Sequence, residues 1–576
     1  MTPHHSSSLL RLLSLLPLLT VPLTSTVTAT PVTLTAHLRQ SNLTELESTF
    51  WAIADPKSSL YLKHLSLPEL AELIGASYED IDAAAAFFKK AGGYDITVSN
   101  LRDTVTASFD SKPDVRLTSR GLPHESTHPD AVEFLVRQDV LPPSTPPLIP
   151  SAPPRTSAGS DSSPSYTISN IKDAYGIPTD YQASHPDTTQ MVWGPGTFGY
   201  SKAKLEAHKI AEAPLINMDK IEFWTENHGT PGGDNFGEGQ LDVDMISSFG
   251  LNVTTLVANT NTSASTEETT GFGAALLNFL TDLSSREEVP HVLSMSLGSL
   301  SSASCNLLCS EAAKTGIALT DCQAYISEQR QVCMYLSDDQ TARINTALQV
   351  LGARGVTVMG SSGDGGSHFS FGPFQGSGDD AAIADALNEV SCKFQMPVFP
   401  TASPYVLSIG GEMWEVNSKH PVTWAGYGGG SGAGFSIQFE APPHQQSSTT
   451  VSDYLQKPGM PPASSFNAKN RAYPDMSAVG VMGTSQSCPI SAGIWSLITD
   501  IRLNKGLPPL GFVAPRLWQV AEEYPGEAFE DIIGGDSNTS CSNGFPATDG
   551  WDANTGFGRP IWDGFVKHFA DDDVHA

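Results

Sequence analysis

Two spacings of apolar residues divide the chain into regions with different expected structures. Over about residues 30–140, apolar positions recur every three or four residues between positions 67 and 90, at Leu67, Leu70, Leu73, Ile74, Ile81, Phe87 and Phe88. Such a spacing places side chains on one face of a helix. The pattern predicts a helix over 67–90 within a small compact domain.

Beyond residue 165, short apolar runs alternate with longer runs of helical spacing. The runs typical of strands cover residues 190–193, 289–296, 356–360 and 405–409. Alternation of this kind indicates an α/β architecture, and we expect one large domain over residues 165–576.

The two regions are joined by a stretch that can bury almost nothing. Residues 141–164 are rich in Pro and Ser, which predicts an extended linker open to cleavage. At the N-terminus, Arg11 precedes an apolar run over 12–23 and small residues up to Ala29. This arrangement predicts a signal peptide over residues 1–29 and a secreted protein; the run is too short to span a bilayer, and a short membrane anchor is the alternative.

Composition narrows the classes of partner. The 576 residues are 39% hydrophobic and 16% charged, values typical of globular proteins, and the formal net charge is −30. A polyanion with a pI near 4.7 repels phosphate backbones and anionic lipid, so neither nucleic acid nor a membrane surface is an expected partner. An acidic working environment suits such a chain.

Seven cysteines in a secreted chain point to disulfides. Four cluster within 29 residues and predict two bridges of open connectivity: Cys305, Cys309, Cys322 and Cys333. Cys392 and Cys541 could form a third bridge, which leaves Cys488 as a buried free thiol. The sequons fit the same secretory route: Asn42, Asn252, Asn261 and Asn538.

The first candidate for chemistry is Ser485, which follows Gly483 and Thr484 and opens a small-residue helical run. A serine at a helix start has an exposed hydroxyl, and the free N–H groups and dipole there favour developing negative charge. That is a suitable place for an acyl-transfer nucleophile. The alternative is an ordinary helix cap followed by a proline.

A histidine base for this serine is poorly supported. His228, Gly229 and Thr230 begin like the histidine motif of subtilisin-type enzymes, but a second histidine and a helix do not follow. The first expected strand of the large domain, 190–193, also carries no carboxylate. We interpret His228 as a loop histidine.

Carboxylates offer another base. Glu238 and Asp242 stand at i and i+4, which on a helix places both on one face, about 6 Å apart along the axis. Asp364 lies in a glycine-rich turn after the expected strand 356–360, where α/β proteins build sites. The alternatives are a solvated acidic face for the pair and a simple Asp-Gly turn for Asp364.

These segments, in this order, resemble the sedolisin family of secreted serine-carboxyl peptidases, which includes acid tripeptidyl peptidases. The resemblance covers nearly the whole chain after the signal peptide and rests on the stretches 237–243, 361–364, 399–406, 431–436, 471–475 and 483–489. It implies a subtilisin-like three-layer α/β domain with a mainly parallel sheet, preceded by a small α+β propeptide domain over residues 30–140. It also implies that the stretch 291–298 is the substrate-binding strand, pairing with peptide main chain.

Carried over residue by residue, the resemblance implies a role for each candidate. Ser485 would be the nucleophile, Glu238 its general base, Asp242 the residue that orients Glu238, and Asp364 a partner of the Ser485 N–H in the oxyanion hole. A carboxylate base works in acid, and Asp364 can donate only while protonated. We therefore expect an acid optimum and loss of activity by pH 7.

The resemblance further implies one structural Ca²⁺ in a C-terminal loop rich in hard oxygen donors. Asp531 and Asp552 would supply carboxylates, and Ile532, Thr548 and Gly550 backbone carbonyls. An acidic loop that binds no ion is the alternative.

The expected function is that of a secreted acid serine-carboxyl peptidase releasing tripeptides from free N-termini of peptides and proteins. The propeptide would be its intramolecular inhibitor, and the enzyme a monomer. An endopeptidase of the same family is the first alternative, because loops decide how the cleft is closed. A non-catalytic secreted binder on this scaffold is the second.

Overall fold

The computed structural model describes most of the chain beyond residue 31. The described residues are 32–111, 129–139, 165–196, 198–224, 237–260, 264–265, 271–328, 332–334, 336–369, 374–415, 418–426, 429–539, 541 and 543–571. The predicted signal peptide (1–29), the predicted linker (141–164) and the His228 motif lie outside them. Within this part of the chain, no helix is long and apolar enough to cross a membrane.

The N-terminal region folds as a small α+β unit around an antiparallel sheet. Its elements are β1 (Val32–Leu38), α1 (Leu43–Ala54), α2 (Leu67–Ile74), α3 (Tyr78–Lys90), β2 (Tyr94–Val98), β3 (Thr104–Phe109) and β4 (Val132–Asp139). The strand order is β2-β3-β1-β4, and a two-residue strand of the large domain, β8 (Ala264–Ser265), adds to the free edge of β4. One sheet therefore spans both domains.

The single helix expected over 67–90 is wrong, because the structure has two helices there. The chain turns extended at Gly75, after the last residue of α2. The hydroxyl of Ser77 then accepts a hydrogen bond from the Asp80 N–H and caps α3. A side chain that caps a new helix start competes with continuation of the old one, although the apolar spacing runs through both.

The large domain is built on an eight-stranded sheet. The sheet contains β5 (Thr189–Pro195), β6 (Ile221–Phe223), β7 (Thr254–Thr260), β9 (Val292–Met295), β12 (Thr357–Ser361), β14 (Leu407–Trp414), β15 (Pro421–Thr423) and β20 (Met476–Val479). The order is β15-β14-β12-β9-β5-β7-β6, with β20 paired to β14, and only the β14–β15 pair is antiparallel. All four expected strands lie in this sheet.

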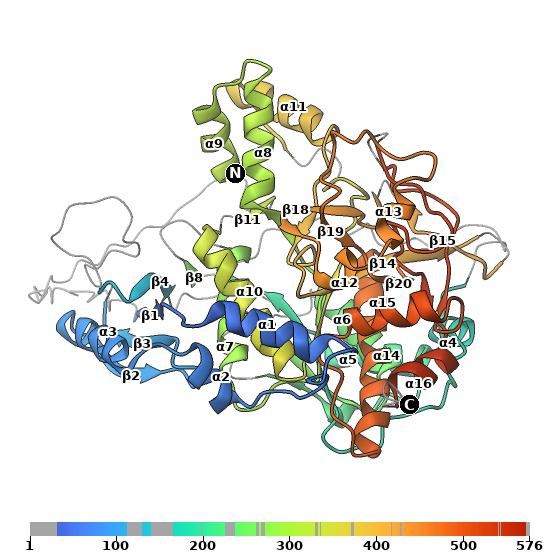
Figure 1. The fold of residues 1–576 in the computed structure, drawn as a ribbon, viewed down its shortest axis with the longest axis horizontal. Coiled ribbons are helices and arrows are strands. Elements are labelled where there is room, and N and C mark those ends of the chain that lie inside the picture. The colour runs from blue at the N-terminus through green and yellow to red at the C-terminus, as the bar shows by residue number, and fades with distance from the viewer. Residues whose placement is uncertain are drawn as a thin grey trace, which may run out of the picture.

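Helices cover both faces of the sheet (Figure 1). α6 (Gly237–Phe249) packs with α14 (Thr484–Asn504) against one face, and α7 (Phe272–Ser284) packs with α10 (Asp338–Ala353) against the other. The other helices of the domain are α4 (Ile168–Tyr175), α5 (Lys202–Ala211), α8 (Ser302–Ala313), α9 (Leu319–Glu328), α11 (Asp379–Ser391), α12 (Pro443–Gln446), α13 (Thr450–Tyr454), α15 (Ala514–Glu523) and α16 (Trp562–Phe569). The predicted α/β class, with a mainly parallel sheet after a small α+β domain, is confirmed.

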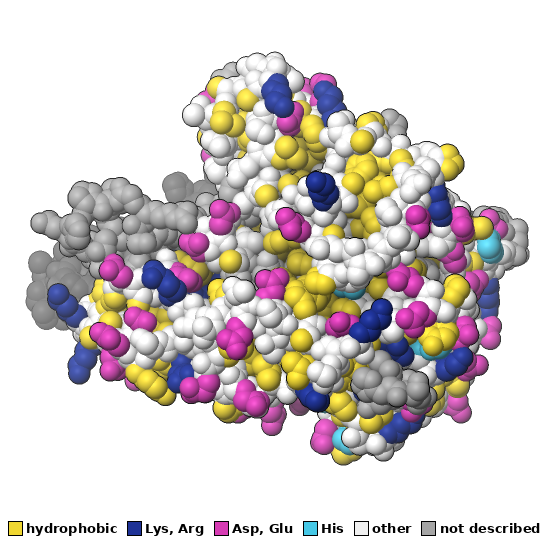
Figure 2. All heavy atoms as spheres, viewed as in Figure 1, with side chains coloured by type: hydrophobic (Ala, Val, Ile, Leu, Met, Phe, Trp, Pro, Cys, Tyr) yellow, Lys and Arg dark blue, Asp and Glu magenta, His cyan; other side chains and the backbone are white. Residues whose placement is uncertain are grey.

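Short strands fix the loops around this sheet. They are β10 (Ser299–Ser301), β11 (Cys333–Met334), β13 (Val398–Phe399), β16 (Ala425–Gly426), β17 (Gly429–Gly430), β18 (Gly434–Glu440), β19 (Asn470–Tyr473), β21 (Phe529–Glu530) and β22 (Arg559–Pro560). Acidic side chains are spread over the face shown in Figure 2 and do not gather in one patch, which fits the strongly negative net charge.

The N-terminal unit is tied to the large domain mainly through α1. Phe50 and Ala54 of α1 belong to the main core of the large domain, and Leu46 and Ile53 pack with Val350 of α10. Phe134 and Val136 of β4 also belong to the main core, α2 packs in the same cluster as Val350, and the sheet and α3 share a further core within the unit. Helix α1 is thus an interface helix.

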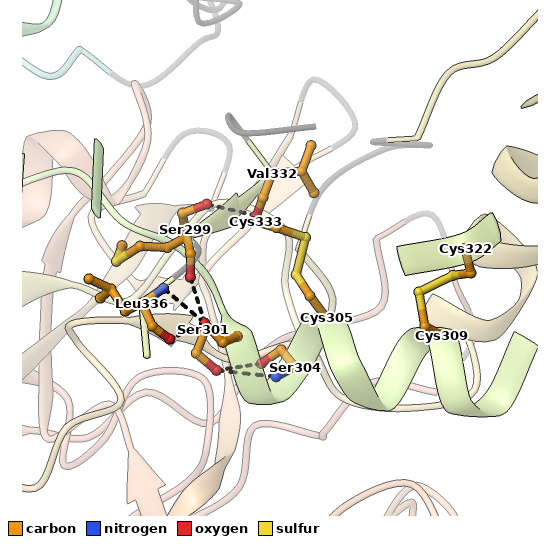
Figure 3. The surroundings of a disulfide bond; sticks show 11 residues. Ser299, Ser301, Ser304, Cys305, Cys309, Cys322, Val332, Cys333 and Leu336 are labelled. Carbon is orange, nitrogen blue, oxygen red and sulfur yellow. Dashed lines mark hydrogen bonds between the residues drawn. A yellow bond between two sulfur atoms is a disulfide. The ribbon is translucent and has the colours of Figure 1, made fainter. Parts of the chain in front are cut away.

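A lobe of α8, α9 and α11 stands out from the body with its own small core (Figure 1). Two disulfides cross-link it, Cys305–Cys333 and Cys309–Cys322 (Figure 3). Cys392 at the end of α11 pairs with Cys541, and Cys488 is a buried free thiol. The expected three bridges and the free cysteine are confirmed, and the structure supplies the pairing.

Candidate active site

The candidate residues meet at the carboxyl ends of the parallel strands. Ser485 lies in the first turn of α14, just beyond β20. Gly483, the residue before this helix, has φ = 103°, and a Cβ added there would lie 2.7 Å from Oδ2 of Asp364. Only glycine can adopt this backbone and also let the helix start approach Asp364 so closely.

Asp364 follows β12 and is held against the start of α14. Its Oδ1 accepts hydrogen bonds from the N–H and the hydroxyl of Thr484, both at 2.8 Å. Asp364 is an exposed residue by its accessible surface, but the protein atoms around its carboxyl desolvate it and raise its pKa. A raised pKa leaves a proton for Oδ2, the oxygen that the Thr484 contacts do not use.

The glycine-rich stretch 429–434 is hydrogen-bonded to the backbone of the turn that carries Asp364. The Gly430 N–H donates to the Asp364 carbonyl at 2.9 Å, and the Gly432 N–H to the Gly363 carbonyl at 2.7 Å. A Cβ at Gly432 would lie 1.9 Å from the Ser362 carbonyl oxygen, so the backbones touch. The stretch positions the turn and adds no chemical group.

Glu238 and Asp242 lie one turn apart on α6, and Asp242 is fully buried rather than on a solvated face. Oε1 of Glu238 and Oδ2 of Asp242 are buried and have no hydrogen-bond partner among the described residues. Burial raises the pKa of both carboxyls, and the charge of Glu238 raises that of Asp242 further. A hydrogen bond with Ser485 acts in the opposite direction on Glu238. The pair therefore retains a proton in mild acid.

Ser296, directly after β9, is a contact of this site that the sequence analysis did not single out. Its hydroxyl donates to Oδ1 of Asp242 at 2.9 Å, and its carbonyl accepts a hydrogen bond from the Ser485 hydroxyl at 3.3 Å. The signal for it was weak: Ser294 and Ser296 stand two apart in an otherwise apolar strand, so their side chains share one face.

Together these groups are of the kinds that acyl transfer without a histidine requires. A hydroxyl stands at a helix start, near two carboxyls on one helix and a third from another turn, and burial raises the pKa of all three carboxyls. The Ser485 hydroxyl lowers the pKa of Glu238 and the charge of Asp364 raises it, so both groups lie near the Glu238 carboxyl. Such a set can remove a proton from a nucleophile, return it, and stabilise an oxyanion.

The expected calcium residues lie together in the C-terminal loop. Oδ2 of Asp531 accepts from the Gly550 N–H at 2.6 Å, and Oδ2 of Asp552 accepts from the Thr548 N–H at 3.3 Å. Oδ1 of Asp531 is buried without a partner among the described residues. Burial raises the pKa of Asp552 to about 7, and the neighbouring Asp531 adds to the rise.

Two acidic groups held close together, one with an orphaned oxygen, fit a bound hard cation. Ile532 is buried beside Asp531. No group of three or more His, Cys, Asp or Glu side chains suited to a metal occurs in the described part of the chain, and the expected set has only two carboxylates, its other donors being carbonyls.

The chain is similar to one family model over its N-terminal region and to known peptidases over most of its length. Residues 23–112 match the family model "Pro-kumamolisin, activation domain". The mouse tripeptidyl-peptidase 1 is 28% identical over 594 residues, covering 93% of this chain and 91% of its own, and physarolisin of Physarum polycephalum is 26% identical over 597 residues, covering 92% of each.

Among solved structures, a Pseudomonas sedolisin, a serine-carboxyl proteinase complexed with pseudo-iodotyrostatin, aligns over 70% of this chain and 98% of its own. It has 19% identity and a TM-score of 0.48, too low to add to the fold described above.

Proposed function

The chain is a serine-type peptidase of the sedolisin family with an N-terminal activation domain, and from that premise we propose that Glu238 and Ser485 carry out acid peptide-bond hydrolysis that releases tripeptides from free N-termini. The observation behind this proposal is the convergence of Ser485, Glu238, Asp242 and Asp364 at one edge of the sheet.

In the proposed mechanism, Glu238 accepts the Ser485 proton as the hydroxyl oxygen attacks the substrate carbonyl carbon. The protonated carboxyl of Asp364 and the Ser485 N–H donate to the oxyanion. Glu238 then passes its proton to the leaving amine as the C–N bond breaks, and an acyl-enzyme forms. A water molecule then attacks the acyl carbon and gives its proton to Glu238. The bond between the acyl carbon and the Ser485 oxygen breaks, Glu238 returns the proton to that oxygen, and the product acid leaves.

Asp242 orients Glu238 in this scheme. We propose that the proton is shared by Oε1 of Glu238 and Oδ2 of Asp242, which have no hydrogen-bond partner among the described residues. A proton held there fixes the orientation of Glu238 toward Ser485.

Tripeptide release is proposed because relatives that match 93% of this chain are named tripeptidyl-peptidase 1. We propose further that the protein is secreted, works as a monomer on peptides and proteins, and is kept inactive by its own N-terminal domain until that domain is cut away.

The test compares two substrates at pH 4 and pH 7 after acid activation: a fluorogenic tripeptide amide with a free amine, and an internally quenched peptide with a blocked N-terminus. Cleavage of the first alone at pH 4, lost in Ser485→Ala and Glu238→Gln, supports the proposal. Comparable cleavage of the blocked peptide shows an endopeptidase instead.

Ser491→Ala is the matched control, since Ser491 is a buried serine of the same helix whose hydroxyl has no partner among the described residues. It should keep full activity. If no activity depends on Ser485, the protein is a binder on a peptidase scaffold.

We also propose one structural Ca²⁺ held by the carboxylates of Asp531 and Asp552 and the carbonyls of Ile532, Thr548 and Gly550. The ion would neutralise two neighbouring carboxylates and hold the loop closed, and would take no part in hydrolysis. Since protons compete for Asp552, whose pKa is about 7 without an ion, the stabilisation should be larger at pH 7 than at pH 4.

A strong chelator should therefore lower the melting temperature by several degrees at pH 7, and added Ca²⁺ should restore it. Asp552→Asn should abolish this response, whereas Asp549→Asn, at an exposed carboxylate outside the set, should keep it. A melting temperature that ignores both chelator and Ca²⁺ would rule the site out.

A further inference from the structure

Among the described residues, Ser296 is the one residue outside α6 whose side chain is hydrogen-bonded to Asp242. It is 5% exposed, and its hydroxyl lies 2.9 Å from Oδ1 of Asp242. A hydroxyl donating to a buried carboxylate oxygen makes a strong, directional contact.

The same hydroxyl has a second acceptor within reach. Pro489 has no N–H, so the Ser485 carbonyl lacks the helix hydrogen bond that residue 489 would otherwise donate. The Ser296 hydroxyl lies 3.4 Å from that carbonyl oxygen. A hydroxyl has only one proton to give, and the shorter contact is with Asp242.

The carbonyl of Ser296 faces the nucleophile. It accepts hydrogen bonds from the Ser361 hydroxyl of β12 at 2.8 Å and from the Ser485 hydroxyl at 3.3 Å. The shorter bond from Ser361 holds the Ser296 backbone in place. One residue thus contacts both the acid pair and the nucleophile.

We propose that Ser296 is a positioning residue that determines where the carboxyl pair keeps its proton. By donating to Oδ1 of Asp242, its hydroxyl makes that oxygen an acceptor. It leaves Oδ2, which has no hydrogen-bond partner among the described residues, to share the proton with Oε1 of Glu238. The inference rests on the proposed function, because it concerns how Glu238 is held as the base for Ser485.

In the part of the chain that the structure describes, the charged and titratable groups around the pair do not replace this hydroxyl as a donor. Glu238 lies on the same helix, Asp364 comes from the turn after β12, and the Cys488 thiol comes from α14. Two of these are acids and the third is a thiol whose pKa burial raises to about 12. Loss of the hydroxyl should therefore raise the pKa of Asp242 and make the pair hold its protons more tightly.

The experiment measures kcat, KM and the pH profile of the acid-activated enzyme for Ser296→Ala, Ser296→Thr and Ser294→Ala. Ser294 is the matched control: it is buried on the same strand face, but its hydroxyl contacts Cys488 instead of the pair. We expect Ser296→Ala to lower kcat about ten- to hundred-fold with KM within about twofold, the size of a lost hydrogen bond to a charged group.

The acid limb of kcat should also move to higher pH by at least about half a unit in Ser296→Ala. Ser296→Thr, which keeps the hydroxyl, should restore both values, and Ser294→Ala should match the wild type. If Ser296→Ala does not fold, Ser296→Cys replaces it: its weak S–H donor should give the same shift at smaller size.

The inference is overturned if Ser296→Ala leaves both kcat and the acid limb of the pH profile unchanged. It is also overturned if Ser294→Ala changes them as much as Ser296→Ala does. Failure of the proposed function gives a different result, a wild type without Ser485-dependent cleavage. The two failures are therefore separable in one set of measurements.

Discussion

Asp364 can donate to an oxyanion only while it holds a proton. Its pKa is raised by desolvation, so the proton is present at acid pH, persists above the usual range of aspartate and is lost as the pH rises through the raised value. Oδ1 is occupied by the two Thr484 donors, which leaves Oδ2 for the proton.

Asp364→Asn tests this role, because an amide in the same place accepts from Thr484 through its oxygen and donates through its nitrogen at every pH. We expect kcat at pH 4 to fall by about tenfold or more, since an amide is a weaker donor than a carboxylic acid. The decline of activity between pH 4 and pH 7 should become shallower, as measured on the tripeptide amide.

Asp364→Ala is the comparison, since it removes both the donor and the acceptor for Thr484. Its kcat should fall by a further factor of ten or more. A pH profile for Asp364→Asn with the wild-type slope would show that another group sets the alkaline limb.

At the residue scale, the sequence allowed prediction of those candidate residues that a short local pattern marks. Ser485 at a helix start and the i, i+4 pair of Glu238 and Asp242 follow from spacing along one segment. The contact between Ser296 and Asp242 joins residues 54 positions apart and depends on how β9 packs beside α6. No local pattern carries that information.

At the scale of elements, the disulfide-linked lobe is anchored next to the site. β10 begins three residues after Ser296 and pairs with β11, whose Cys333 is bonded to Cys305 on α8 (Figure 3). The bridge closes a loop of 28 residues, and a loop of this length corresponds to about 3.6 kcal/mol in the chain-entropy account.

Removing that bridge in the pair Cys305→Ser with Cys333→Ser should loosen the lobe before the body unfolds. We expect faster limited proteolysis within residues 302–334 and a kcat reduced severalfold, because β10 begins three residues after Ser296, which contacts Asp242 and Ser485. The shorter Cys309–Cys322 bridge lies farther along the lobe, so its paired serine variant should show the faster proteolysis with unchanged kcat.

Helices and strands were predicted correctly where the spacing of apolar residues alone decides the structure. The prediction failed where a capping side chain ends one helix and starts another. The four strands were found because buried parallel strands are continuous apolar runs. The helix expected over 67–90 is broken by the Ser77 cap. Disulfide pairing within the cluster was out of reach because spacing allows three connectivities for four cysteines.

At the scale of the whole molecule, the two domains are joined by a buried ionic contact. Arg343 of α10, 2% exposed, donates to Asp103 at 3.1 Å and to Glu133 at 2.7 Å, and also to the Leu38 carbonyl. Both carboxylates belong to the N-terminal unit. Removing one partner of such a buried set costs about 3–5 kcal/mol, because the remaining charges lose their compensation.

Arg343→Met should therefore weaken the hold of the N-terminal unit on the large domain. We expect conversion of the full chain to the mature enzyme to start at higher pH and to run at least tenfold faster at pH 5. Gel electrophoresis of samples taken over time measures this rate. Lys393→Met, which breaks an exposed pair with Glu389, should leave the rate unchanged. Equal rates in all three proteins would argue against Arg343 as a clamp.

Because β8 pairs with β4, the intact chain and the released large domain fold under different conditions: only the intact chain contains the strand that β8 pairs with. β8 is two residues long, and in the described structure its neighbour is β4, from the segment that would leave on activation. A refolding mature chain would have to close this part of its surface without that template. The folded state of the mature large domain would then last only because it unfolds slowly, which is kinetic stability. The uncleaved chain should regain its structure after denaturation, whereas the mature enzyme, once unfolded, should be lost for good.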